Sequence, residues 1–208
     1  MSGDIDLYGD WGAWEDREAT RGVDPMNAAT LLFGNVPVPY TASWTSEESV
    51  FLARCPYADA IALCQPSSPG EGKPLFGKPH MCRQREVIAL GLCDLCGKPL
   101  KNRTKVSLSH ARSRANGASP FDVLQVEPLL HKECALLSAR HCPSLRRDLR
   151  NGTVEVRQVT SWAVQFAIYS EQGTFEACGV RQKSISHAKV QLRAWKDRSP
   201  QWLGMTDD

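Results

Sequence analysis

The sequence lacks a long apolar segment. No run within its 208 residues approaches the roughly 18–20 apolar side chains that a helix needs to cross a bilayer. Residues 1–25 are acidic and lack the basic, then apolar pattern of a secretion signal. We therefore expect a cytoplasmic protein with no membrane partner, in which thiols stay reduced. In that setting its eight cysteines should bind metal or lie buried rather than form disulfides.

The sequence also lacks a complete phosphate-binding loop and a true repeat. The segment GKPLFGKP (72–79) approaches the Gly-x4-Gly-Lys-Ser/Thr pattern, but Pro79 stands where a hydroxyl would hold magnesium. Proline also removes a backbone N–H that would face the phosphates. The repeated Gly-Lys-Pro triplet is too short to indicate a repeat architecture. We expect only a long Pro/Gly loop over 65–80.

Charge is distributed unevenly, although the net charge of the chain is only +2. Residues 1–25 carry a net charge of −5 and include Trp11 and Trp14, whereas residues 98–150 carry +7. This separation favours an anionic partner for the middle of the chain, or pairing between the two segments. The acidic arm could alternatively bind another protein, such as a host protein.

The pattern of turn residues and apolar positions predicts an α+β fold. We expect an acidic arm (1–25), a helical and loop region (26–81), a zinc module (82–150), a C-terminal β-meander with a closing helix (151–200), and a tail (201–208). A short helix is expected within 26–45, and a second from Thr45 to about Ala62. Three β-rich runs after residue 151 indicate the antiparallel meander. The apolar positions in 184–197, which include Ala188, Val190, Leu192 and Trp195, predict an amphipathic helix.

A metal-ligand pattern occupies the middle of the chain. Cys93 and Cys96 form a Cys-x2-Cys knuckle followed by Gly97, and His131 and Cys134 follow after 34 intervening residues. Residues at i and i+3 share one face of a helix, so His131 and Cys134 can reach one ion. A Cys3His set suits tetrahedral Zn²⁺, and four protein donors indicate a structural site.

Two other donor groups compete with this set. His141 and Cys142 lie at the end of the expected helix over 131–141. A second site could use four further donors, Cys55, Cys64, His80 and Cys82, although their spacing fits no compact knuckle.

The order of knuckle, hairpin and ligand-bearing helix is that of a treble-clef zinc finger. Within that group, residues 93–138 resemble the His-Asn-His (HNH) endonucleases. The segment VSLSHARS places His110 where that family has its general base. In VEPLLHKECALLS, His131 replaces the family's third cysteine and Cys134 matches its fourth.

The resemblance is incomplete. Val126 stands at the position of the family's asparagine, and Ala135 stands where a histidine follows the last cysteine. In the family these groups orient the base and hold the catalytic cation, so nuclease activity is the alternative here and not the main expectation. The cysteine-rich sequence also resembles small uncharacterised proteins of phages and actinobacteria.

The main expectation is a zinc-stabilised protein of phage or mobile-element origin that binds nucleic acid, DNA rather than RNA. Basic side chains around the zinc module would contact phosphates, and their binding would depend strongly on salt. The expected contact residues are Lys101, Arg103, Lys105, Arg112, Arg114, Arg146 and Arg147.

Overall fold

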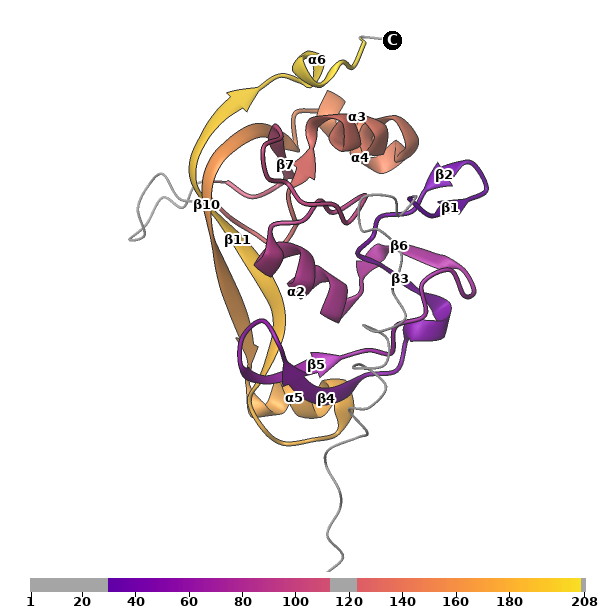
Figure 1. The fold of residues 1–208 in the computed structure, drawn as a ribbon, viewed down its shortest axis with the longest axis vertical. Helices are drawn as coiled ribbons and strands as arrows, with labels where there is room; N and C mark the ends of the chain where they lie inside the picture. The colour runs from indigo at the N-terminus through magenta and orange to yellow at the C-terminus, as the bar shows by residue number, and fades with distance from the viewer. Residues whose placement is uncertain (1–29, 113–122, 207–208) are drawn as a thin grey trace, which may run out of the picture.

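The computed structural model describes residues 30–112 and 123–206. Their fold is mixed α+β and is organised around a curved seven-stranded sheet (Figure 1). The strand order is β4-β5-β11-β10-β7-β9, and β8 pairs with β11. These strands are β4 (Phe51–Cys55), β5 (Ala60–Cys64), β7 (Lys105–Ser109), β8 (Val123–Gln125), β9 (Leu130–His131), β10 (Glu155–Tyr169) and β11 (Ser184–Arg198).

Short strands and helices complete the described residues. Two small sheets pair β1 (Leu32–Phe33) with β2 (Val36–Pro37), and β3 (Ala42–Trp44) with β6 (Pro74–Pro79). The helices are η1 (Thr45–Glu47), α2 (Met81–Leu90), α3 (Lys132–His141), α4 (Pro143–Arg150), α5 (Glu171–Cys178) and α6 (Pro200–Leu203). Within the described ranges, none of the helices is both long and apolar enough to span a membrane.

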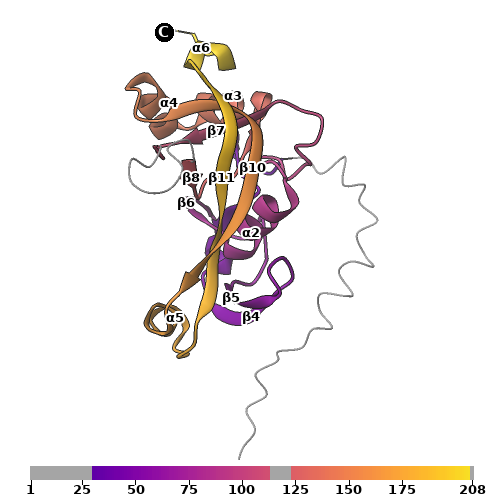
Figure 2. The same cartoon turned by 90° about the vertical axis from the view of Figure 1, so that its left-hand side faces the viewer.

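The longest feature is the antiparallel hairpin of β10 and β11, with 15 residues in each strand. Figure 2 shows it running the length of the molecule, with α5 at one end and α6 at the other. Register shifts near Ser161 and Ile168 bend β10, as β-bulges do. One strand therefore replaces the first two strands of the expected meander.

The expected meander and closing helix at 151–200 are wrong in their details. The run GTFEACGVRQ contains α5, which begins at its N-cap Ser170 and ends at Gly179 in the left-handed conformation. The segment expected to be a helix is β11. Its buried residues Ala188, Val190 and Leu192 recur every second position, which is the period of a strand.

The two helices expected before residue 65 are also wrong within the described residues. The first region contains short strands, and the second contains only the turn η1 before the hairpin of β4 and β5. Glu47 explains the short turn, because its carboxylate points inward, accepts the Trp44 N–H at 2.8 Å and pairs with Arg83. By contrast, the strand expected at 104–111 is confirmed as β7, and the helix expected at 131–141 is confirmed as α3.

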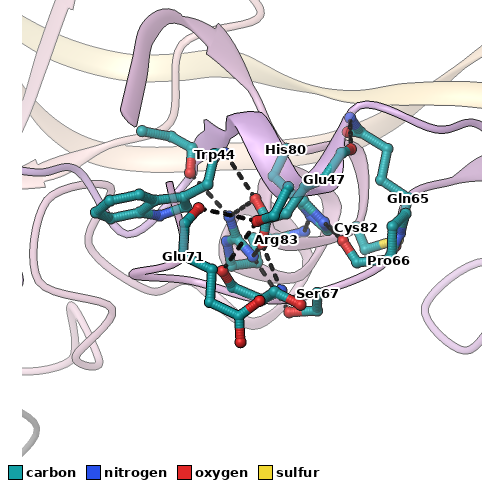
Figure 3. Close-up of polar contacts among 12 residues, drawn as sticks. Trp44, Glu47, Gln65, Pro66, Ser67, Glu71, His80, Cys82 and Arg83 are labelled. Atoms are coloured by element: carbon teal, nitrogen blue, oxygen red, sulfur yellow. Dashed lines mark hydrogen bonds and ion pairs between the residues drawn. The ribbon is translucent and has the colours of Figure 1, made fainter. Parts of the chain in front are cut away.

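The pair of Glu47 and Arg83 organises the long loop between β5 and β6 (Figure 3). Arg83 donates from Nη1 and Nη2 to the two carboxylate oxygens at 2.8 and 2.7 Å, and Ser68 N–H donates to Glu47 at 2.8 Å. Burial raises the pKa of Glu47, but the hydrogen bonds from Arg83 and Ser68 bring it below its ordinary value. Residues 65–73 of the predicted Pro/Gly loop are thus held to a buried ion pair at the start of α2. The loop predicted over 65–80 is wrong at its end, because Pro74–Pro79 pair with β3 as strand β6.

Helix α2 joins this loop to the sheet. Gln84 donates to the carbonyl of Ala188 at 2.8 Å and accepts the N–H of the same residue at 2.9 Å. It also donates to the carbonyl of Val126 at 2.9 Å. A single buried amide therefore ties α2 to β11 and to the segment after β8.

The main hydrophobic core lies between the sheet and the helices near the centre of the chain. Its members come from the knuckle region, β7, α3 and the hairpin, and include Cys93, Val106, Ala135, Val156 and Leu192. Because Cys93 is fully buried in this core, the knuckle is part of the fold and not an appendage.

Candidate metal centre and surrounding basic residues

The knuckle is a tight turn between Leu92 and Pro99, which form an isolated β-bridge. The N–H of Cys93 donates to the Lys98 carbonyl at 2.8 Å, and the N–H of Gly97 donates to the Cys93 carbonyl at 2.8 Å. Gly97 has a φ of 66°, and a Cβ there would lie 2.9 Å from the ring of Tyr40. Only glycine fits at position 97 without strain. The tight turn that it permits presents both cysteine sulfurs on one side.

The other two donors come from the junction of β9 and α3. His131 pairs with Lys105 of β7 and is also the N-cap of α3, and Cys134 lies in the first turn of that helix. The knuckle is connected to this junction through the backbone, since the Asp94 N–H donates to the Leu129 carbonyl at 3.0 Å. The sheet and the knuckle together place His131 and Cys134 opposite the cysteine pair.

The four donors converge. Their ligand atoms all lie within 4.8 Å of one another. Nδ1 of His131 is 3.5 Å from Sγ of Cys96 and 3.8 Å from Sγ of Cys134. Tetrahedral ligation with metal–sulfur and metal–nitrogen distances of about 2.3 and 2.0 Å separates such atoms by about 3.6 Å. The cluster could therefore hold a metal ion.

The imidazole of His131 has the tautomer that a metal requires. Its Nε2 lies 3.0 Å from the Pro99 carbonyl, which can only accept a hydrogen bond, so Nε2 carries the proton. Nδ1 then presents its lone pair to the three sulfurs. This outer hydrogen bond is the usual device by which proteins orient a histidine ligand.

Among the three cluster cysteines, the surroundings lower the pKa of Cys96 alone and raise the pKa of Cys93 and Cys134. Hydrogen bonds from the Cys134 and Cys93 thiols lower the pKa of Cys96 far below its usual range, against the effect of burial. The same contacts, with burial, raise the pKa of Cys134. The backbone N–H of His131 also points at Sγ of Cys93 at 3.4 Å.

The competing donors do not form a site. Cys142 is exposed and accepts the Leu145 N–H as the N-cap of α4, and neither it nor His141 belongs to a group of three donors. His80 is buried and uses both ring nitrogens, since Nδ1 accepts the Arg83 N–H at 3.2 Å and Nε2 contacts the Pro66 carbonyl at 2.9 Å. Across the described residues, the Cys93 cluster is the only group of three or more converging donors found.

The expected basic residues fall into two groups. The knuckle group comprises three residues that follow the knuckle in the sequence, Lys101, Arg103 and Lys105. Arg103 forms an exposed ion pair with Glu133 of α3. The helix group, Arg112, Arg146 and Arg147, lies at or near α4, where Arg112 donates to the Thr153 carbonyl at 2.9 Å. Arg114 lies outside the described residues, as do Trp11 and Trp14 of the acidic arm.

Acidic neighbours partly offset the helix group. Arg112 pairs with Glu155 at 3.3 Å, and Arg147 pairs with Asp148 at 3.0 Å. His110, the proposed general base, is exposed at the end of β7, and its Nε2 lies 3.7 Å from Asp148. His110 thus stands beside a carboxylate, away from the metal cluster.

Three contributors to the site were not identified from the sequence. Tyr40 packs against Gly97, the Pro99 carbonyl orients His131, and Lys132 stacks 4.4 Å over the ring of Trp202. None of these contacts has a local signal in the sequence, because each joins segments that are distant in the chain.

Comparison of the chain with protein-family models, with curated proteins and with solved structures finds no match.

Proposed function

We propose that the chain is a zinc-stabilised nucleic-acid-binding protein whose metal centre is a treble-clef-like arrangement of Cys93, Cys96, His131 and Cys134. The observation that carries the zinc assignment is the donor set itself. Three sulfurs and one oriented imidazole suit Zn²⁺ better than the hard, oxygen-preferring cations. Four protein donors leave no position open for substrate, so the role of the ion is structural.

The nucleic-acid role rests on the exposed cations beside this centre. Lys101 and Arg103 occupy the loop that leaves the knuckle, and Arg146 and Arg147 are exposed on α4. A metal-stabilised knuckle would hold the first pair at a fixed distance from α3, whose exposed side carries Arg140. Such cations contact phosphates with little dependence on sequence, and we propose duplex DNA as the preferred ligand.

A salt-titrated binding assay on the zinc-loaded protein tests this function. We expect the logarithm of the affinity for a short DNA duplex to fall linearly with the logarithm of the salt concentration. The double variant Lys101→Ala/Arg103→Ala should reduce the slope by about 1 for each phosphate contact that is lost. Lys183→Ala is the matched control, because Lys183 is exposed next to β11 at the α5 end of the molecule.

The function is refuted if the zinc-loaded protein does not retain DNA or RNA at low salt. It is also refuted if the control and the double variant lower affinity by the same factor for each charge removed, because binding would then reflect overall charge alone.

An HNH-like nuclease is a second candidate, favoured by one contact. The carboxylate of Asp148 lies 3.7 Å from Nε2 of His110 and could orient that imidazole as a base. The candidate requires magnesium-dependent cleavage of DNA that disappears in His110→Ala and persists in His141→Ala. If the two variants cleaved DNA equally, the activity would come from a contaminant and not from His110.

A further inference from the structure

A second pair of cysteines lies outside the metal cluster. Cys64 ends β5 and is 7 % exposed, and Cys82 is half-buried in the first turn of α2. Both sulfurs contact the same side chain, that of Arg85. Figure 3 shows Cys82 beside Gln65, the residue that follows Cys64, and its Sγ lies 3.9 Å from the Gln65 carbonyl. The end of strand β5 and the start of helix α2 therefore bring a pair of free thiols together.

Arg85 lies against both sulfurs. Its Nη2 is 3.4 Å from Sγ of Cys64 and 3.7 Å from Sγ of Cys82. The residue is only 1 % exposed, its Nη1 donates to the Ser186 carbonyl at 2.8 Å, and its Nε has no hydrogen-bond partner. No carboxylate forms an ion pair with it in the part of the chain that the structure describes. The neighbouring Glu86 instead accepts a hydrogen bond from the Tyr40 hydroxyl at 2.8 Å.

A buried guanidinium needs a negative partner, because burying an unpaired charge is strongly unfavourable. The groups in contact with Arg85 that can become negative are the two thiols. A thiolate at this position would neutralise the guanidinium, and the guanidinium would in turn stabilise the thiolate.

Cys82 is the thiol placed to ionise. It occupies the second position of α2, where the backbone N–H groups and the helix dipole favour negative charge. The hydrogen bond from Cys64, together with the charges of Arg85 and Arg83, outweighs burial and lowers the pKa of Cys82 to about 6. The same hydrogen bond and burial raise the pKa of Cys64, so Cys64 is the protonated donor of the pair.

We propose that Cys82 and Cys64 form a peroxide-sensitive dithiol, in which Cys82 reacts with the oxidant and Cys64 completes a disulfide. The Cys82 thiolate attacks one oxygen of hydrogen peroxide, the O–O bond breaks, and hydroxide leaves and takes up a proton to become water. Cys82 is thereby oxidised to a sulfenic acid. The Cys64 sulfur then loses its proton and attacks the Cys82 sulfur, the S–O bond breaks, and a second water leaves.

The net reaction converts two thiols and one peroxide into one disulfide and two waters. It removes the negative charge of the Cys82 thiolate beside Arg85 and links β5 covalently to α2. The site shares no residue with the metal cluster, so its test is independent of the proposed binding function.

The first test measures the ionisation of Cys82 in the zinc-loaded, full-length wild-type protein. Iodoacetamide labelling is followed as a function of pH, and each cysteine is quantified by peptide mass spectrometry. We expect the labelling rate of Cys82 to reach half its maximum about two pH units below that of free N-acetylcysteine labelled in parallel, since an unperturbed thiol has a pKa of about 8.5. A midpoint for Cys82 equal to that of free N-acetylcysteine overturns the proposal without the need for any variant.

The second test asks whether the disulfide forms. After treatment with one equivalent of hydrogen peroxide and digestion without reductant, we expect a cross-linked peptide pair containing Cys64 and Cys82. In Cys64→Ser, the sulfenic acid at Cys82 should persist long enough to be trapped by dimedone. Oxidation of Cys142 with Cys82 left as a thiol would overturn the proposal, and Cys82 overoxidised in wild type without a cross-link would exclude Cys64 as the resolving thiol.

The role of Arg85 is tested by the pH profile and not by stability. Arg85→Gln should move the labelling midpoint of Cys82 upward by about one pH unit or more, because the opposing charge is lost. Arg54→Gln, which removes an exposed arginine of β4, should leave the midpoint unchanged. If Arg85→Gln does not fold, the wild-type profile and the cross-link decide the question.

Discussion

Nδ1 of His131 lies 3.5 Å from Sγ of Cys96, although the two residues are 35 positions apart. The separation matches two ligands of one tetrahedral ion, and the Pro99 carbonyl on the far side of the ring fixes the imidazole in that orientation. This relationship links the knuckle to α3 and underlies the metal predictions.

Replacing one ligand should abolish metal binding. We expect Cys96→Ser to lower the zinc content from about one ion per chain to a small fraction of that, with a clear fall in melting temperature, because metal binding contributes directly to folding. Elemental analysis and thermal unfolding measure both effects. Cys142→Ser is the control and should retain the ion. Loss of zinc in the control alone would show that the proposed donors are the wrong ones.

The turn at Gly97 should tolerate no side chain. Gly97→Ala must adopt a left-handed conformation, at about 1–2 kcal/mol, and must also displace the Tyr40 ring, at a further 1–3 kcal/mol or so. Gly152→Ala has a similar φ of 65° and no atom within 4 Å of the added Cβ, so it should show only the first effect. Urea unfolding of both variants measures the difference, and equal losses would contradict the contact with Tyr40.

The buried pair of Glu47 and Arg83 should make stability depend on acid. The pKa of Glu47 is lowered in the folded protein, so the contribution of its charge is complete above the unfolded pKa near 4.3 and is lost as the pH falls through the folded value. We expect Glu47→Gln to destabilise the protein by about 3–5 kcal/mol at pH 7, since Arg83 is left buried and unpaired.

This destabilisation should shrink below about pH 4, as wild-type Glu47 becomes protonated. Urea unfolding of both proteins from pH 3 to pH 7 checks the trend. Glu48→Gln, at an exposed ion pair with Lys78, is the control and should change stability by less than about 1 kcal/mol throughout. A penalty for Glu47→Gln that stays constant with pH would contradict the assignment.

The bridging amide of Gln84 should be a strong determinant of stability. Gln84→Ala leaves the Ala188 N–H and two carbonyls without their buried partner, and each unsatisfied group costs about 1–3 kcal/mol. We expect a total loss of at least about 3 kcal/mol by denaturant unfolding. Gln172→Ala removes an exposed amide that bonds only Glu176 and should cost less than about 0.5 kcal/mol. Similar losses in the two variants would show that α2 does not depend on this bridge.

The sequence predicted the parts of this protein whose signals are local. The Cys-x2-Cys spacing, the pairing of His131 with Cys134, the strand β7 and the helix α3 all follow from neighbours within a few residues. For that reason the four donors of the metal cluster could be predicted from the sequence alone.

Tertiary structure decided the rest, because the deciding contacts join distant segments. Residues 184–197 form a strand, since β10 supplies its hydrogen-bond partners and buries every second side chain. Glu47 turns inward because it pairs with the buried Arg83. Cys64 and Cys82 come together because the end of β5 lies beside the start of α2, where Arg85 contacts both sulfurs. Local propensity is worth tenths of a kcal/mol per residue, whereas burying a charge or leaving a polar group unsatisfied is worth several, so the long-range contacts prevail.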